Sequence, residues 1–435
     1  MSPVNNAIVP KQGVRSIFKA MDPAIRLLLV IGFLETTAFI FYTSVLMPYY
    51  RTLGFGPEVA GILNSVLQVS SAVTLLISGF AADRLGRKRL YIGGQLMRCI
   101  VAGSLLFTKS YWGFVAIHVV RGLGSMQSPA QNAIVAEYSD RSTLATSFAF
   151  VDTLAQFAAV CAPILAGAVA DKHGVKVPFT IGLTLATVAV LLGLGIKEAK
   201  SGATSAEPAK PSPSTAKTAD RNPSGQTKSF LSQISDMFTH NSPVALYLLL
   251  AANLVSGLAN GTVGIILPFT IMDRFSDTYT AVSAVQTAAA LGTMLVLVLG
   301  GRLADLYGRR RVIMTSLILP PTIALVFGAT SIWQMYAVIM VVTLIGNLSS
   351  PAIRALHLEV VRQGDRASFS GLSSGLSSVG YALGSVLAGF CYKWSPNGAW
   401  IVDIILFTLS GVLFVMAASR HERSPGAEQE AVATS

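Results

Sequence analysis

Charged residues are scarce in this chain of 435 residues. Asp, Glu, Lys and Arg make up 12% of the sequence, about half of the roughly 25% usual in soluble domains, while hydrophobic residues make up 52%. A water-soluble protein of this length needs a charged surface that so few charges cannot build. The composition therefore excludes an ordinary soluble enzyme, a disordered scaffold and a nucleic-acid-binding protein. It indicates that membrane lipid surrounds most of the chain.

Cysteine and catalytic motifs are also scarce. The three cysteines lie far apart in apolar runs without C-x-x-C spacing, which is typical of small buried hydrophobic residues rather than of disulfides or metal sites. The sequence contains no Walker loop, no H-E-x-x-H, no Cys/His cluster and no nucleophile elbow. We therefore expect neither an enzyme nor a bound cofactor, and no transport driven directly by ATP.

Long apolar runs make up most of the chain. A membrane helix needs about 20 apolar residues, and twelve runs approach or exceed that length. The predicted spans are 25–48, 58–80, 90–109, 111–135, 144–169, 179–196, 243–269, 279–300, 312–331, 333–356, 367–391 and 398–419. The predicted fold class is an all-α membrane protein with twelve transmembrane helices.

A polar segment containing four prolines divides these spans six to six. It cannot bury enough apolar surface to fold alone and is expected to be a flexible linker. The predicted organisation is an N-terminal tail (1–24), a six-helix bundle (25–196), the linker (197–242), a second six-helix bundle (243–419) and a C-terminal tail (420–435).

Lysine and arginine are sorted between two sets of connections. The set that includes both tails and the linker holds 24 of the 32 basic residues, whereas the other set holds 6. Basic loops stay on the cytoplasmic side, so both termini and the linker are expected in the cytoplasm. The formal net charge of +11 is then a topology signal facing anionic lipid and not a nucleic-acid-binding patch.

The two halves carry the same loop motif, GFAADRLGRKR at 79–89 and GRLADLYGRRR at 301–311, displaced by 222 residues. The first glycine lets two helices approach closely, the aspartate can pair with an arginine or accept from a helix N-terminus, and the second glycine permits a tight turn. The candidate residues are Gly79, Asp83, Gly86, Arg87, Gly301, Asp305, Gly308 and Arg309. Two halves repeated in the same orientation are typical of secondary transporters.

This motif resembles the cytoplasmic loop signature of the major facilitator superfamily. Because the motif occurs in both halves of a twelve-span chain, the resemblance covers essentially the whole sequence. It implies two pseudo-symmetric six-helix bundles that alternate access by rocking about a central cavity. It also implies that Asp83 and Arg87, with Asp305 and Arg309 as counterparts, form a charge network that locks one conformation. We expect a monomer in the bacterial cytoplasmic (inner) membrane or a membrane derived from it.

Ionisable residues inside the spans concentrate in the first half. The candidates for coupling to protons or cations are Glu35, Arg98, His118, Arg121 and Asp152. Such groups are costly in lipid unless they are paired or hydrated, so each indicates function by default. Arg121 matches the arginine of the family's R-x-x-Q-G pattern in span four, which implies a part in proton coupling, although the Gln-Gly does not match. A structural ion pair of either arginine with Glu35 or Asp152 is the alternative.

Polar residues inside the second-half spans are mostly uncharged and are expected to supply hydrogen bonds and shape. With two residues of span two, the candidates for a substrate cavity are Asn64, Gln68, Asn253, Asn260, Gln286 and Tyr381. Asn64 and Gln68 are equally consistent with hydrogen bonds that hold helices together. Asp403 lies toward the outer end of the last span and is expected only to snorkel to the membrane surface.

These features favour a secondary active transporter that moves a small solute and is coupled to protons. Pro163 and Gly167 in span five partly match the glycine-rich stretch of the family's drug–proton antiporters, which suggests an exporter of that kind. One alternative is a metal-ion transporter, for example of iron, or another cation transporter, with Glu35, His118 and Asp152 as oxygen and nitrogen ligands. A second alternative is a transport-dead membrane sensor or scaffold on the same fold.

Overall fold

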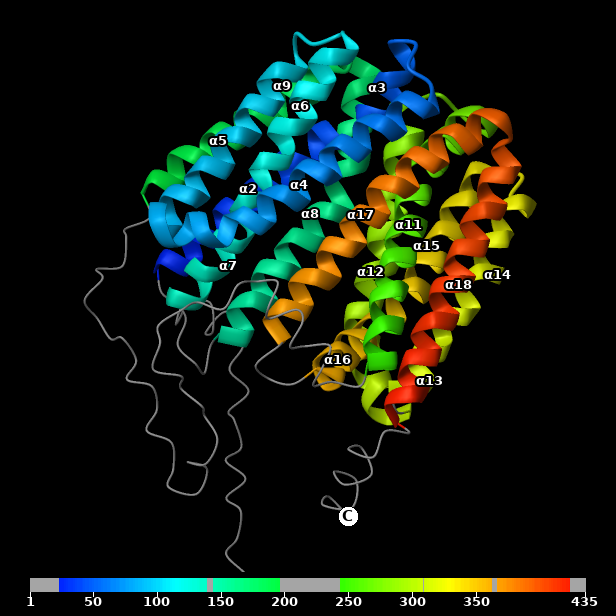
Figure 1. Cartoon of the computed structure of the whole chain (residues 1–435). Coiled ribbons are helices and arrows are strands. Elements are labelled where there is room, and N and C mark those ends of the chain that lie inside the picture. The colour runs from blue at the N-terminus through cyan, green and yellow to red at the C-terminus, as the bar shows by residue number, and fades with distance from the viewer. Residues whose placement is uncertain (1–22, 139–143, 196–242, 308, 362–365, 423–435) are drawn as a thin grey trace, which may run out of the picture.

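The computed structural model describes residues 23–138, 144–195, 243–307, 309–361 and 366–422. These residues form helices joined by short turns, with no strand among them, which confirms the predicted all-α class. The predicted linker lies outside the described residues, as do the C-terminal tail beyond residue 422 and all but the last two residues of the N-terminal tail. Figure 1 shows the helices as two groups side by side, the first in blue to teal and the second in green to red.

The helices follow the order of the predicted spans. In the first half they are α2 (Pro23–Thr43), α3 (Leu46–Thr52), α4 (Pro57–Leu85), α5 (Arg87–Leu105), α6 (Tyr111–Leu123), η1 (Gly124–Met126), α7 (Gln127–Tyr138), α8 (Leu144–His173) and α9 (Lys176–Leu194). In the second half they are α11 (Pro243–Arg274), α12 (Tyr279–Tyr307), α13 (Arg309–Met314), η2 (Thr315–Ile318), α14 (Leu319–Ala324), η3 (Leu325–Gly328), α15 (Ile332–Leu348), α16 (Ser350–Val360), α17 (Arg366–Trp394) and α18 (Pro396–Glu422).

Four predicted spans are broken helices in the described chain: α2–α3, α6–η1–α7, α13–η2–α14–η3 and α15–α16. Proline accounts for two of the breaks, because it lacks an amide hydrogen and clashes with the preceding turn. It stands in the first positions of α14 and of α16. In span four the break is the short 3-10 turn η1, a feature that often marks a hinge.

Ten helical segments of the described chain are long and apolar enough to cross a membrane. The two predicted spans that do not meet this measure are α5 and the segment 111–138. Both carry strongly polar side chains within their length, including Gln95 and Arg98 on α5 and Arg121 and Gln127 on the other. The candidate site described below lies at these polar groups of α5 and of the segment 111–138.

The two halves meet along two helix pairs. α4 packs on α17, seen in blue and orange in Figure 1, and α8 packs on α12. Glycines allow α4 and α17 to pack closely. A Cβ at Gly61 would stand 2.3 Å from the Ser385 carbonyl oxygen, and one at Gly389 would stand 2.5 Å from the Pro57 carbonyl oxygen. Small residues let membrane helices approach in this way.

The bundle has two distinguishable ends. The end at which α9 finishes and α11 begins is called the linker end here, and it also bears the turn between α4 and α5. Gly86 makes that turn with a φ of 85°, a conformation that favours glycine. The opposite end bears the short turns at residues 53–56, 174–175, 275–278 and 395.

Candidate functional site

A buried polar cluster surrounds Glu35 in the first half. Glu35 of α2 is only 5% exposed. Its Oε2 accepts a hydrogen bond from the side-chain amide of Gln127, at the start of α7, and a weaker one of 3.5 Å from the hydroxyl of Tyr91 on α5. Its Oε1 is buried without a partner among the described residues, as is Oε1 of Gln127. The carboxyl group therefore has one oxygen held by donors and one oxygen free to take a proton.

Gln127 reaches Glu35 because of the local backbone. The η1 turn interrupts span four directly before Gln127, and Gln127 is buried with 1% exposure. Gly94 of α5 leaves space for the Gln127 side chain, because a Cβ at position 94 would stand 2.6 Å from Cβ of Gln127. Sequence reasoning missed Gln127, although the Gly93-Gly94 pair on α5 and the glycines before Gln127 are signals of close helix approach.

Two arginines flank the Glu35 cluster. Glu35 and Arg98 line the same small cavity, together with Phe39, Tyr42 and Gln95. The guanidinium carbons of Arg98 and Arg121 lie 5.4 and 4.9 Å from the centre of the Phe39 ring, so both make cation–π contacts with it.

The ion pairs found in the described chain join neither arginine to Glu35 or Asp152. The structural ion pair considered as the alternative role for these residues is thus not formed in this conformation. Arg98 keeps positive charge beside Glu35 without neutralising it through a direct contact, while Arg121 lies against the Phe39 ring.

His118 belongs to a different environment. It is buried, its Nδ1 lies 2.8 Å from the Phe114 carbonyl oxygen one turn earlier, and its Nε2 lies 3.2 Å from the hydroxyl of Tyr50. Tyr50 stacks edge-on against Phe114. Both ring nitrogens are therefore engaged, and His118 connects α6 to α3 rather than joining the cluster around Glu35.

The candidate metal ligands do not come together. Asp152 is exposed on α8, and Glu35 and His118 have the separate partners described above. Among the described residues, no three side chains of His, Cys, Asp or Glu are arranged to hold a metal ion. Glu35, His118 and Asp152 therefore do not form a ligand set in this conformation.

A large polar cavity lies inside the second half. It has a volume of about 910 Å³ and is lined by residues of α11, η2, α14, α15, α16, α17 and α18. Its most regular wall is α17, where five serines at helical spacing present hydroxyl groups: Ser370, Ser373, Ser374, Ser377 and Ser378. Asn253, Asn260 and Asn347 add amides.

Among the described lining residues, charged groups lie near the linker end of this cavity. Arg354 and His357 of α16 line it there, and Nε2 of His357 is 3.1 Å from the Asn253 side-chain nitrogen. The lining residues in the described chain include no carboxylate. The cavity therefore offers many hydrogen bonds to a ligand and a positive charge at its mouth.

The other residues expected in a substrate cavity lie where the halves or helices meet. Asn64 donates to the Ser385 hydroxyl across the α4–α17 contact at 2.9 Å. Gln286 accepts from Ser44 across the halves at 3.1 Å. The Tyr381 hydroxyl lies against Gly264 of α11, and Gln68 is half-buried one turn beyond Asn64. For Asn64, the alternative role in joining helices matches this geometry.

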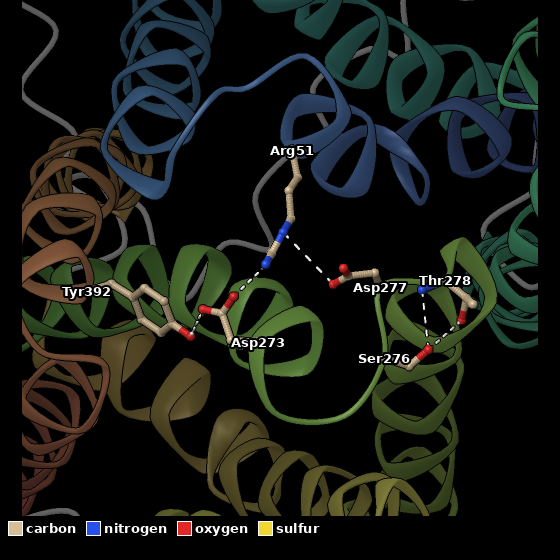
Figure 2. Close-up of polar contacts among 6 residues, drawn as sticks. All are labelled: Arg51, Asp273, Ser276, Asp277, Thr278 and Tyr392. Atoms are coloured by element: carbon tan, nitrogen blue, oxygen red, sulfur yellow. Dashed lines mark hydrogen bonds and ion pairs between the residues drawn. The ribbon is translucent and has the colours of Figure 1, made fainter.

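Charged residues join the halves at the end opposite the linker, as Figure 2 shows. Nη1 of Arg51 on α3 lies 2.5 Å from Oδ1 of Asp273 on α11, and Nε lies 3.9 Å from Oδ1 of Asp277. The Tyr392 hydroxyl of α17 donates to the other oxygen of Asp273 at 2.8 Å. One arginine of the first half thus holds two carboxylates of the second half.

Two further contacts complete this connection. Lys393 of α17 lies 2.8 Å from Glu58 at the start of α4. Asp171 of α8 accepts from the backbone amides of Tyr279 and Thr280, each at 2.8 Å, and so caps the N-terminus of α12 across the halves. We call the residues Arg51, Glu58, Asp171, Asp273, Asp277, Thr280 and Lys393 the latch, and the end where they lie the latch end.

Most residues of the predicted loop network lie outside the part of the chain whose side chains the structure describes. Gly79 and Asp83 fall in the last turns of α4, and Gly301 and Asp305 fall in α12, but the structure does not describe their side chains. Gly308 and the side chain of Arg309 are also outside the described part, while Arg87 begins α5 with an exposed side chain. Their role as a conformational gate stays a prediction.

A family model described as Major Facilitator Superfamily matches residues 27–252 and 249–434. Curated relatives match over part of their length. A Na(+), Li(+), K(+)/H(+) antiporter of Planococcus maritimus is 29% identical over 40% of this chain and 42% of its own. The multidrug resistance protein MdtG of Serratia proteamaculans is 30% identical over 38% of this chain and 42% of its own.

The matched segments thus span about two fifths of the length of these relatives. The substrates in the relatives' names are therefore not assigned to this chain. Solved transporters share the fold along nearly the whole chain. The nucleoside transporter NupG gives a TM-score of 0.68 at 15% identity and covers 93% of this chain and 100% of its own. A POT family transporter in complex with 5-aminolevulinic acid gives 0.73 at 13% identity and covers 92% and 96%.

The family and these relatives are transporters rather than enzymes. The family match extends over both halves, and the apolar helices make the chain an integral membrane protein. The family expected from the repeated loop motif is therefore confirmed: this chain belongs to the major facilitator superfamily.

Proposed function

We propose that this protein is a proton-coupled secondary transporter of a small polar solute, with Glu35 as a proton-binding group. The observation that carries the proposal is the Glu35 cluster. A carboxyl group is buried inside a membrane span, one oxygen is held by Gln127 and Tyr91, and the other has no partner in the described chain. Intramembrane carboxyls of this kind mark proton or ion pathways in transporters.

The surroundings of Glu35 suit a change of protonation. The positive charge of Arg98 beside it compensates for an ionised carboxyl, and the missing direct ion pair leaves the carboxyl free to bind a proton. Glu35 and Arg98 border the same narrow gap, which has no room for a water molecule. A movement of α2 against α5 or α7 would change these contacts and with them the affinity of Glu35 for a proton.

The second-half cavity is the proposed solute site. Its volume of about 910 Å³ lies within the 300–1,000 Å³ range that holds small ligands, and its lining of hydroxyls and amides fits a ligand with several hydrogen-bonding groups. Arg354 and His357, without a carboxylate in the described lining, favour a neutral or anionic solute over a lipophilic cation. The first half would then supply coupling and the second half recognition.

The latch fits an alternating-access cycle. It joins the halves at the latch end, while the solute cavity extends to Arg354 and His357 at the linker end. With both termini and the linker in the cytoplasm, as the basic loops predict, this conformation faces the cytoplasm and is closed to the outside. An exporter would load its solute from this state, in the manner suggested by the multidrug resistance relative.

The test is flux through the purified full-length protein in proteoliposomes. A panel of neutral, anionic and cationic solutes is offered with and without a proton gradient. We expect transport of a polar neutral or anionic compound that the gradient accelerates. Flux that does not respond to the gradient would remove the coupling, and transport restricted to lipophilic cations or divalent metals would contradict the solute site. Absence of any flux would favour a transport-dead sensor.

A further inference from the structure

A second carboxyl group is buried inside the membrane in the other half of the molecule. Asp403 of α18 is 0% exposed, and neither of its side-chain oxygens has a hydrogen-bond partner among the described residues. The expectation that Asp403 snorkels to the membrane surface is therefore wrong. The side chain lies on the face of α18 that packs inward, where Trp400 is also buried, and a short aspartate cannot reach past that contact to water.

Polar contacts on either side of Asp403 fix the face that it shares. One turn earlier, the Trp400 indole donates to the Thr270 hydroxyl of α11 at 2.9 Å. Two turns later, the Ser410 hydroxyl donates to the Ala252 carbonyl of α11 at 3.4 Å. Both contacts tie α18 to α11, so Asp403 lies between them on the same side of the helix.

None of the ion pairs and side-chain hydrogen bonds found in the described chain joins a charged group of the packed helices to Asp403, and Arg311 of α13 is exposed. At the latch end, Asp273 is held by Arg51 and Tyr392, Lys393 pairs with Glu58, and Arg274 donates to the Val326 carbonyl at 3.2 Å. Toward the linker end, Arg354 and His357 line the far part of the cavity. The Asp403 carboxyl is therefore buried without a hydrogen-bond or ion-pair partner in the described chain.

The solute cavity ends next to Asp403. Phe407, Ser410 and Phe414 of α18 line this cavity, and they follow Asp403 at spacings of four, seven and eleven residues, which place all four on one helix face. Phe407 is therefore about 6 Å from Asp403 along the helix axis, since each residue rises about 1.5 Å. The hydroxyl-lined cavity therefore extends from Arg354 and His357 near the linker end to Phe407, one helical turn from Asp403.

An ionised carboxylate without a partner costs several kcal/mol or more in such surroundings, and buried groups take up a proton instead. We propose that Asp403 is a second proton-binding site, which is loaded from the linker end through the solute cavity. In this proposal a proton from water in the cavity binds the carboxylate and gives the neutral acid. It leaves to water when the rearrangement of α18 against α11 opens the site.

This site goes beyond the proposed coupling at Glu35. Glu35 lies in the first half with amide and hydroxyl donors around it, whereas Asp403 lies in the second half with none, so the two carboxyls bind protons independently in this conformation. The transporter then carries one proton in each half. Loading through the cavity also places proton and solute on the same path from the linker end.

Infrared spectroscopy of the full-length protein in lipid tests the site without measuring transport. A protonated carboxyl gives a C=O stretching band that an ionised carboxylate lacks. We expect this band at neutral pH in the wild type, loss of one component in Asp403→Asn, and a separate component lost in Glu35→Gln if that group is also protonated. Asp277→Asn, which removes an exposed carboxylate, is the matched control and should leave the band unchanged.

Identical bands in the wild type and Asp403→Asn would overturn the proposal, whatever the outcome for Glu35. If Asp403→Asn does not fold, Asp403→Glu keeps the carboxyl and should shift the same component. A spectrum of Asp403→Glu that overlies the wild-type spectrum would equally overturn it. Because the readout is a vibrational band, loss of transport in another variant leaves this test intact.

Discussion

At the scale of single residues, charge in an apolar run points to Glu35 as a candidate but does not reveal its partners. An ionisable group in a membrane span is visible in the sequence because lipid makes it costly. Gln127, Tyr91 and Gln95 carry no charge, and three separate helices must fold before they meet Glu35. Asp403 stands out in the sequence for the same reason as Glu35. Its burial, however, depends on which face of α18 packs on α11, and the local sequence does not determine that face.

Gln127 gives a prediction at this scale. In Gln127→Leu the Glu35 carboxyl loses its amide donor inside a buried site. Hydrogen bonds to charged groups contribute about 1.5–3 kcal/mol, so we expect proton-driven flux in proteoliposomes to fall by about ten-fold or more, since 1.4 kcal/mol is a factor of ten. Gln131→Leu makes the same change one turn further along α7 and should transport normally. Equal rates for the two variants would contradict a role for Gln127.

At the scale of helices, the close packing of α11 on α17 explains the positions of four glycines. Gly257 and Gly261 of α11 face α17, while Gly380 and Gly384 of α17 face α11, so both helices carry a Gly-x-x-x-Gly pattern at one contact. A Cβ at Gly384 would stand 2.0 Å from the Leu258 carbonyl oxygen. The sequence alone does not identify the partner helix of such glycines, because a Gly-x-x-x-Gly motif fits any close neighbour.

Substitution of these glycines tests the helix contact. Gly384→Ala should lower the thermal stability of the purified protein in detergent, because overpacking costs typically about 1–3 kcal/mol. Gly375→Ala is the matched control on α17, since nothing lies within 4 Å of its added Cβ. Alanine favours a helix over glycine by about 1 kcal/mol, so this variant should be unchanged or slightly more stable. A Gly384→Ala protein as stable as Gly375→Ala would refute the close contact.

At the scale of the whole molecule, the family and the all-α fold could be predicted, whereas the conformation could not. Twelve apolar runs and a motif displaced by 222 residues are properties of the chain itself. The choice between conformations depends on a difference of only a few kcal/mol between two packings of the same helices. The latch contacts belong to the conformation that this structure adopts. The latch residues lie in short turns and helix ends that carry no shared motif.

Removal of Arg51 should shift this balance. Partly exposed ion pairs contribute up to about 1 kcal/mol, so Arg51→Ala should raise the population open at the latch end by up to about five-fold. Spin labels at Lys109→Cys and Ser395→Cys, with Cys99, Cys161 and Cys391 replaced by serine, report the separation of the halves. We expect a larger share of long distances in Arg51→Ala.

The control for this experiment is Arg274→Ala, because Arg274 also lies at the latch end but bonds to the Val326 carbonyl within the second half. Its distance distribution should match that of the parent protein. An unchanged distribution in Arg51→Ala, or the same shift in both variants, would show that the ion pairs of Arg51 do not hold the halves together.

The most direct test of the central claim separates coupling from solute passage in Glu35→Gln. Proteoliposomes containing this variant are assayed for exchange of labelled solute at equal concentrations and for uphill accumulation driven by a proton gradient, with Glu359→Gln as control. The account predicts that exchange persists while accumulation is lost in Glu35→Gln, and that both persist in the control. Uphill accumulation at the wild-type level in Glu35→Gln would contradict it.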